Sequence, residues 1–231
     1  MTFAEFEKSM SAYRAGRYLA ACGGKKQKAI ALYRLNLVLS QNAFSVIGCL
    51  EISLRNAIDE CYLYHHGSDW LRTSVAIGGI FCLRPCQRTR IVIEKAIHQL
   101  QSHSPHPHHN QLVSKMDFGF WRYLLAAPQF NAAGQKLLQA FPAKPRSSPS
   151  HNINHTYIFR ELELINQFRN RLAHHEPICF APGLATIDSS NARSIHRLSH
   201  KLISWLGHDS RSLLYGIDHV ESLCNKLDHF I

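Results

Sequence analysis

The side chains best suited to chemistry gather in the last third of the chain, in the stretch NQFRNRLAHHEPI. They are Arg169, Asn170, Arg171, His174 and His175. An imidazole changes charge near neutral pH, so it can take a proton from a ribose hydroxyl or give one to a leaving alkoxide. A guanidinium is permanently charged and forked, which suits a phosphate and the charge that develops on it. The stretch predicts acid–base chemistry on a phosphate ester, with Asn170 orienting either partner.

A helix must position these residues, and we expect it over residues 156–175. Its apolar side chains recur at steps of three and four residues, so one face is buried and the polar groups gather on the other. The recurring residues are Leu162, Ile165, Phe168 and Leu172. Thr156 is the expected N-cap, and Pro177 the expected stop signal. A helix C-terminus carries about half a negative charge, which favours the protonated form of His174.

The spacing of Arg169 and His174 raises a geometrical difficulty. The two residues lie five positions apart, which on an ideal helix turns them about 140° away from each other. Either an unwinding helix end at His174 or a two-fold dimer that sets two such helices against one cleft would bring them together. We favour the dimer. The alternative without chemistry is an exposed basic helix end, in which His174 caps carbonyl groups and Arg169 forms a surface ion pair.

Other groups of potential ligands give weaker indications. Histidines crowd residues 98–109, at His98, His103, His106, His108 and His109. His-x-His spacing can bind zinc, but the run HSPHPHHN contains no carboxylate or thiol, and we interpret it as a polar loop without a metal. Cys82 and Cys86 would need two more ligands. Phe118 and Trp121 could stack on bases, but their helical spacing favours a place in the core.

The composition is that of an ordinary globular protein with a basic surface. The 231 residues are 45% apolar and carry 26 Lys plus Arg against 16 Asp plus Glu, a formal charge of +10. Such a surplus attracts polyanions without selecting nucleic acid by itself. The seven cysteines include no Cys-x-x-Cys pair, the start MTFAEFEKSM does not resemble a signal peptide, and no uncharged apolar run approaches about 20 residues. We expect a reduced, soluble, cytoplasmic protein with no membrane partner.

Helical periodicity dominates the chain, and no stretch shows the sustained alternation of a strand, so we predict an all-α fold. Besides the helix above, we expect helices at residues 2–20, 25–66, 87–101, 111–126, 130–141, 188–206 and 210–230. Thr2 and Asp188 are expected N-caps. The 25–66 pattern allows one helix or two with a bend near Ser40. The Pro- and Ser-rich segment 142–155 is expected to be a long exposed loop inside a single domain of residues 1–231.

The segment RNRLAHHEPI resembles the Arg-x4-6-His motif of the HEPN superfamily, and it is most similar to the Abi-like branch of the AbiD and AbiF type. Three further features resemble that branch. They are LEISLRNAIDE followed by a Gly-x-x-Trp-Leu turn at residues 50–71, DFGFWRYLL at residues 117–125, and a helix ending in Ser-Trp-Leu at residues 204–206. Together the features span about residues 30–206, most of the chain.

This resemblance implies an HEPN-like helical bundle with long antiparallel helices and extra peripheral helices. It implies a metal-independent endoribonuclease without cofactor, in which Arg169 and His174 are catalytic and Asn170 is the polar residue of the motif. In that family two motifs usually meet across a dimer interface. The pair Arg55 and Asn56 has no His four to six residues later, so it forms no second motif. It could bind RNA near the site, or Arg55 could simply pair with a carboxylate one turn away.

The function we expect is that of an abortive-infection toxin of bacterial phage defence. It would cut RNA by attack of the 2′-hydroxyl, leaving a 2′,3′-cyclic phosphate, with Arg171 and His175 in supporting roles. The expected partners are RNA, a second copy of the chain, and an antitoxin protein or inhibitory RNA. Two alternatives stay open: an HEPN protein that binds or regulates RNA without cutting it, and a helical protein–protein module of phage defence whose basic charge is incidental.

Overall fold

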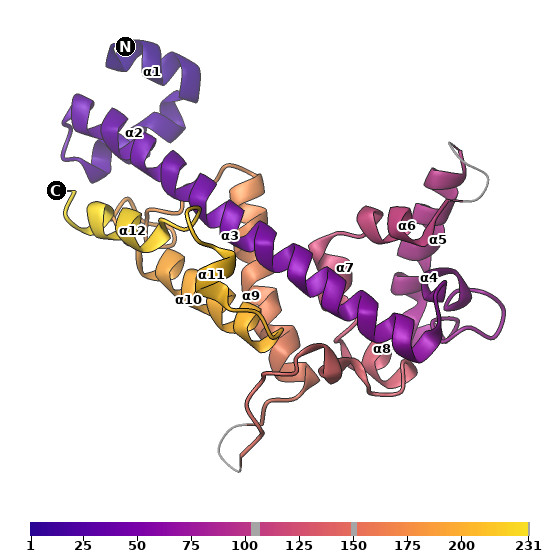
Figure 1. Cartoon of the computed structure of the whole chain (residues 1–231). Helices are drawn as coiled ribbons and strands as arrows, with labels where there is room; N and C mark the ends of the chain where they lie inside the picture. Colours follow the sequence, from indigo (N-terminus) through magenta and orange to yellow (C-terminus); the bar gives the residue numbers. More distant parts are fainter. Residues whose placement is uncertain (103–106, 149–151, 231) are drawn as a thin grey trace. The chain divides into compact units, whose positions relative to one another are not determined.

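The computed structural model describes residues 1–102, 107–148 and 152–230 (Figure 1). Over these residues the chain forms helices and no strand, and one isolated antiparallel bridge joins Phe180 and Ile187. The all-α prediction is therefore confirmed for the described part of the chain. The HEPN-like arrangement of the bundle stays a prediction.

The helices follow one another along the chain, with longer connections before η1, α9 and α10. In chain order they are α1 (Phe3–Met10), α2 (Ala12–Ala21), α3 (Lys26–His66), α4 (Trp70–Thr73), the 3-10 turn η1 (Arg84–Cys86), α5 (Gln87–Gln101), α6 (His109–Lys115), α7 (Phe118–Tyr123), α8 (Ala127–Ala132), the 3-10 turn η2 (Leu137–Ala140), α9 (His155–Ala173), α10 (Ser190–Trp205), α11 (Ser210–Leu213) and α12 (Val220–Asp228).

The first expected helix is two helices, α1 and α2. Thr2 caps α1 as predicted, in a capping box with Glu5. The break lies at Ser11, whose backbone has φ 74°, outside the helical region, while its hydroxyl accepts a hydrogen bond from the Arg14 N–H at the start of α2. A local hydrogen bond from Ser therefore competes with helix continuation, which the apolar spacing alone does not reveal.

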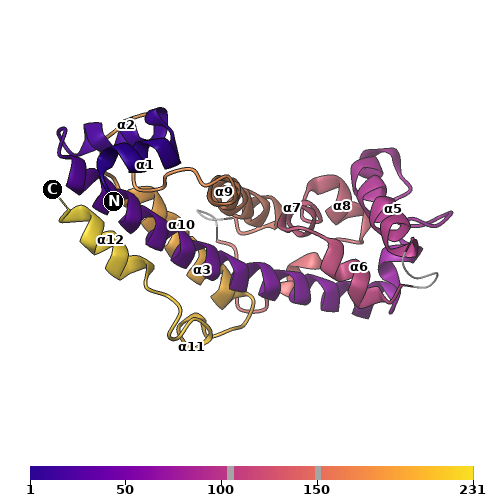
Figure 2. The same ribbon diagram turned by 90° about the horizontal axis from the view of Figure 1, so that it is seen from above.

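The helix α3 is single and unbroken in both views, without the bend that we allowed near Ser40 (Figures 1 and 2). It ends at Gly67, where the backbone turns to φ 88°. By length and composition this one helix could cross a membrane, although the core helix of a soluble protein passes the same test. The prediction of a soluble chain stays a prediction.

Three other expected helices are also interrupted. The 111–126 pattern forms α6 and α7, because Met116 is extended and the Asp117 carboxylate caps α7 at the Phe120 N–H. The 130–141 pattern forms α8 and η2, and the 210–230 pattern forms α11 and α12. In each case the apolar spacing continues through the turn between the two helices, so it predicted one helix where the structure has two.

The described chain divides into two compact units. The first consists of Met1–Cys49, Gln167–His200 and Arg211–Ile231, and the second of Leu50–Asn166 and Lys201–Ser210. Their boundaries fall within α3, α9, α10 and α11, not at the Pro- and Ser-rich segment. That segment, as far as it is described, runs through the second unit without regular secondary structure and is largely exposed.

The first unit has an aromatic core and one buried polar link. Tyr18 packs edge-on against Tyr33, with 5.4 Å between ring centroids, and lies 5.0 Å from Phe180. Asn36 of α3 is 3% exposed, and its Oδ1 accepts hydrogen bonds from the N–H groups of Ile178 (2.9 Å) and the following residue. These bonds satisfy buried donors and fix the chain segment that follows α9.

The second unit is built around two buried tryptophans, Trp70 and Trp121. Trp70 stacks on Tyr62 at 4.2 Å between centroids, and its indole N–H donates to Asp59 at 2.7 Å. Trp121 and Phe118 are 0% and 1% exposed. Their predicted place in the core is confirmed, and these aromatic rings do not form a platform for bases.

Candidate functional site

The helix α9 presents the stretch that the sequence singled out. Its N-cap is Asn154, whose Oδ1 accepts a hydrogen bond from the Tyr157 N–H at 2.9 Å. The prediction of Thr156 as the cap was wrong by two residues, because Thr156 already lies inside the helix. The predicted apolar face is confirmed, since its members are all buried: Leu162, Ile165, Phe168 and Leu172.

The C-terminal end of α9 is a Schellman turn. The Glu176 N–H donates to the Arg171 carbonyl at 2.9 Å, and the His175 N–H donates to the Leu172 carbonyl at 3.0 Å. His175 therefore occupies the position that helices usually give to glycine, and its φ is 55°. A non-glycine residue in this conformation is uncommon, and His is one of the residue types enriched there.

The turn presents its imidazoles to solvent. Asn170, His174 and His175 are exposed, whereas Arg169 and Arg171 are half-buried. The Nε of Arg169 is shielded from solvent. Arg171 is fixed by its own turn, because its Nε donates to the Glu176 carboxylate at 3.2 Å and its Nη2 donates to the Pro177 carbonyl at 2.9 Å.

One of the two explanations for the Arg169–His174 spacing does not hold. The His174 N–H still donates to the Asn170 carbonyl at 2.9 Å, so helical geometry continues to that residue and changes only at His175. Unwinding at His174 therefore does not remove the separation of about 140° around the axis. Within one chain, the helix by itself does not bring the two side chains to one face.

An open pocket in the first unit adjoins this turn. It is lined by residues of the α2 start and the α9 end, namely Ser11, Tyr13, Arg14, Arg17, Arg171, Glu176 and Pro177. Three guanidinium groups face one carboxylate here, so the pocket is positive. Tyr13 is 93% exposed at its rim. Guanidinium groups beside an exposed aromatic ring suit the phosphates and bases of a nucleic acid strand.

Arg17 forms part of the rigid wall of this pocket. Its Nη2 donates to the Leu184 carbonyl at 2.6 Å and to the Ala181 carbonyl at 3.3 Å, and its guanidinium lies 4.6 Å from the centre of the Phe180 ring. These contacts hold the segment after α9 against α2. A ligand in the pocket would then meet a prearranged cation, which lowers the cost of ordering on binding.

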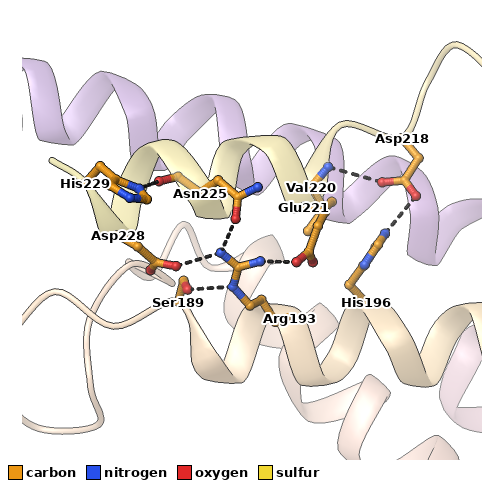
Figure 3. A network of polar contacts seen from close by, with 9 residues as sticks. All are labelled: Ser189, Arg193, His196, Asp218, Val220, Glu221, Asn225, Asp228 and His229. Atoms are coloured by element: carbon orange, nitrogen blue, oxygen red, sulfur yellow. Dashed lines mark hydrogen bonds and ion pairs between the residues drawn. The ribbon is translucent and has the colours of Figure 1, made fainter.

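A second group in the first unit was missed by the sequence reasoning. The Nε2 atoms of His196 and His200 each lie 2.7 Å from Oδ2 of Asp218, and they lie 3.2 Å from each other. Oδ1 of Asp218 accepts a hydrogen bond from the Val220 N–H at 3.1 Å (Figure 3). Burial raises the pKa of Asp218, but the hydrogen bonds from both imidazoles and from Val220 outweigh it and leave this pKa below its ordinary value.

Arg193 forms a second group of polar contacts between α10 and α12 (Figure 3). Its guanidinium, on α10, pairs with Glu221 and Asp228 of α12, the latter at 2.6 Å, and donates to Asn225 at 2.8 Å. Its Nε donates to the Ser189 hydroxyl at 3.0 Å. This network accounts for Arg193 structurally, as a charged link between α10 and α12.

The remaining predicted residues lie in the second unit. The Arg55 Nε donates to its neighbour Asn56 at 3.4 Å, and both residues lie on α3. His109 pairs through Nε2 with Asp59 at 2.9 Å, and the Cys82 thiol donates to the Ala76 carbonyl at 2.9 Å. Within the described residues, neither the histidine-rich segment nor the Cys82–Cys86 pair belongs to a cluster of three ligands, although His103 and His106 lie outside that part.

A sequence signal for the missed group did exist. His196 and His200 are four residues apart on the expected 188–206 helix, which places two imidazoles on one face. No comparable signal links Asp218 to them, because it lies outside that helix and reaches it only through the packing of α12. The prediction of Asp188 as the N-cap of α10 was wrong by one residue, because the Arg193 N–H donates to the Ser189 carbonyl and the helix begins at Ser190. Asp188 accepts a hydrogen bond from the Ser190 N–H at 2.8 Å just before the helix.

Comparison with known proteins gives no relative on which to rest an assignment: no family model, no curated protein and no solved structure matches this chain.

Proposed function

We propose that this protein is a metal-independent endoribonuclease of the Abi-like HEPN type, a toxin of bacterial phage defence. The proposal rests on the residues of its Arg-x4-His stretch and on one structural observation. The exposed His174 belongs to the same turn of α9 that lines a pocket with three guanidinium groups. A proton-transfer group next to a phosphate-binding surface is what RNA cleavage requires.

In the proposed reaction, His174 takes the proton of a ribose 2′-hydroxyl as the 2′-oxygen attacks the adjacent phosphorus. The bond from phosphorus to the 5′-oxygen of the next nucleotide breaks, and the imidazolium gives its proton to that leaving oxygen. The products are a 2′,3′-cyclic phosphate and a 5′-hydroxyl. Arg169 stabilises the charge that builds on the phosphoryl oxygens, and Asn170 orients the reacting groups.

The pocket supplies the binding half of the proposal. Arg14 and Arg171 would contact backbone phosphates, and the exposed Tyr13 would stack on a base. The net charge of +10 would attract RNA at long range and make the affinity fall with added salt. Arg34, an exposed arginine of the first unit that does not line the pocket, provides a matched control for these contacts.

The second candidate is an RNA-binding protein that uses the same pocket without cutting. It is favoured by the geometry of α9, which within one chain leaves Arg169 and His174 turned about 140° apart. Cleavage then requires a second chain, whereas binding does not. The third candidate, a protein–protein module of phage defence, needs no RNA at all.

Incubation of the full chain with single-stranded RNA in excess EDTA separates these functions. We expect cleavage with 2′,3′-cyclic phosphate ends, unchanged in the double variant His106→Ala, His108→Ala. Arg14→Ala should weaken RNA binding and flatten its salt dependence, and Arg34→Ala should do so less. Salt-dependent binding without cleavage would support the second candidate, and neither binding nor cleavage would support the third.

A further inference from the structure

The group formed by His196, His200 and Asp218 places three potential ligand atoms close together. The three atoms lie within 4.8 Å of one another. The side chains are 12%, 23% and 15% exposed, so the group lies in a half-buried niche of the first unit, with solvent access. Both histidines project from the same face of α10, and Asp218 comes from the segment just before α12.

This convergence exceeds what a structural histidine needs. One carboxylate partner is enough to orient one imidazole, as the pairing of His109 Nε2 with Asp59 shows in the second unit. Here two imidazoles aim Nε2 at the same carboxylate oxygen, and their nitrogens approach to 3.2 Å. Nitrogen donors converging with one carboxylate oxygen form the ligand set of a first-row transition metal.

The dimensions can be compared with a zinc site. Bonds of about 2.0–2.1 Å in tetrahedral geometry place neighbouring ligand atoms about 3.3 Å apart. The separation of 3.2 Å between the two imidazole nitrogens matches this edge. The distances of 2.7 Å from these nitrogens to the Asp218 oxygen are hydrogen-bond lengths. The carboxylate would therefore withdraw by about 0.6 Å when a metal replaces those two hydrogen bonds.

The donor types also select among cations. Calcium and magnesium prefer oxygen ligands, and magnesium requires near-ideal octahedral geometry. Two neutral imidazoles and one carboxylate suit zinc or a similar divalent transition metal, with water in the fourth position. We propose that His196, His200 and Asp218 bind one such ion, with zinc as the best match, and that the ion links α10 to the start of α12.

The link would act together with the Arg193 network. Arg193 contacts α12 at Glu221, Asn225 and Asp228, whereas the metal would fix the chain at Asp218, just before α12 begins (Figure 3). The helix would be held near both of its ends. The proposed ion would thus tie α10 to α12, and its ligands differ from the residues assigned to RNA cleavage, so each proposal can fail without the other.

One feature limits the affinity of the site. Metal-binding histidines normally donate their second ring N–H to an acceptor, and loss of such a partner typically costs 10–100-fold in metal affinity. Nδ1 of His196 is buried and has no hydrogen-bond partner within the described structure. His196 also lines a small cavity together with Val46, Ile47 and Val220. We therefore expect zinc affinity below that of a fully supported structural site.

Metal stoichiometry and hydrogen exchange on the full chain test this inference. Titration with zinc should show one equivalent that disappears in the double variant His196→Ala, His200→Ala and in Asp218→Asn. Asp218→Asn keeps the size of the side chain, so it guards against loss of the fold. Zinc should slow amide exchange in α12 of the wild type, and this protection should be absent in Asp218→Asn.

Two controls separate this site from other histidines. His106→Ala with His108→Ala removes the His-x-His pair of the polar segment, and His109→Ala removes an imidazole that pairs with one aspartate. Both control variants should still bind one equivalent of zinc and should still show slower amide exchange in α12 when zinc is added. The proposal would be overturned if the wild type, Asp218→Asn and the double variant of His196 and His200 all bound zinc equally. Loss of the bound zinc only in the double variant of His106 and His108 would also overturn it.

Discussion

His174 and Arg169 differ in their surroundings in a way that fits different roles. His174 is exposed at the end of α9, where it can meet a large substrate and exchange protons with water. Arg169 is half-buried, with its Nε shielded from solvent. A shielded guanidinium interacts more strongly with charge than an exposed one, because less water screens it. At this scale the candidate site combines one accessible proton carrier with one sheltered cation.

The residue scale also gives a prediction for alkaline pH. Burial raises the pKa of the Cys179 thiol to about 12, although Arg17 and hydrogen bonds oppose the shift. In the unfolded chain this thiol ionises near pH 8.5. Between the unfolded and the folded pKa the folded state keeps this proton while the unfolded chain loses it. The stabilisation of the folded state by the neutral thiol is therefore complete below the unfolded pKa and is lost as the pH rises toward about 12.

Chemical denaturation of the wild type and Cys179→Ala between pH 9 and pH 11 measures this effect. The free energy of unfolding of the wild type should fall more steeply, by up to about 1.4 kcal/mol per pH unit. Below pH 8 the two slopes should coincide, which provides the control. Parallel curves over the whole range would show that burial does not hold this thiol neutral.

At the scale of elements, periodicity predicted α5 completely and the extent of α3 and α9 closely, because long apolar faces dominate those segments. It failed where short polar groups end a helix. Ser11 and Asp117 each form a local backbone hydrogen bond that starts a new helix while the apolar period continues. The sequence contains these residues, but their effect depends on packing that periodicity does not describe.

The N-terminus of α9 allows a direct test of its cap. Asn154→Ala removes the oxygen that accepts the Tyr157 N–H, so it should lower the free energy of unfolding by about 0.5–2 kcal/mol. Thr156→Ala, two residues later, should cost less, because Thr156 lies inside the helix. Denaturation midpoints of both variants provide the comparison. A larger loss for Thr156→Ala would restore the cap expected from the sequence.

At the scale of the whole molecule, the candidate site was only partly predictable. The sequence identified Arg169, Asn170, Arg171 and both neighbouring imidazoles, since these lie together in one stretch. It could not supply Arg14 and Arg17, because they reach the pocket from α2, more than 150 residues earlier in the chain. Asp218 was missed for the same reason. Groups that meet only through tertiary packing leave no local pattern.

The geometry of α9 predicts that cleavage needs two chains. A two-fold interface uses the same surface of each copy, so two α9 ends could supply Arg169 from one chain and His174 from the other. Mixed Arg169→Ala and His174→Ala chains should then regain activity. The rate should rise well above that of either variant alone, to about a quarter of the wild type, because about half of randomly mixed dimers contain both variants and each of these keeps one of its two Arg169–His174 pairs.

RNA cleavage rates of the exchanged mixture, beside sedimentation of the wild type, check this prediction. A mixture no more active than its two components would exclude a site shared between chains. A wild-type protein that cuts RNA at full rate as a monomer would also contradict it.

The most direct test of the central claim is the cleavage rate of purified His174→Ala on single-stranded RNA in excess EDTA. General acid–base catalysis contributes about 10²–10⁴-fold, so we predict a loss of at least about 100-fold, with helical content and melting unchanged. Arg169→Ala should show a comparable loss, His175→Ala a milder one, and the exposed His208→Ala none. Wild-type rates in His174→Ala or Arg169→Ala, or wild-type cleavage abolished by EDTA and restored by a divalent metal, would contradict the account.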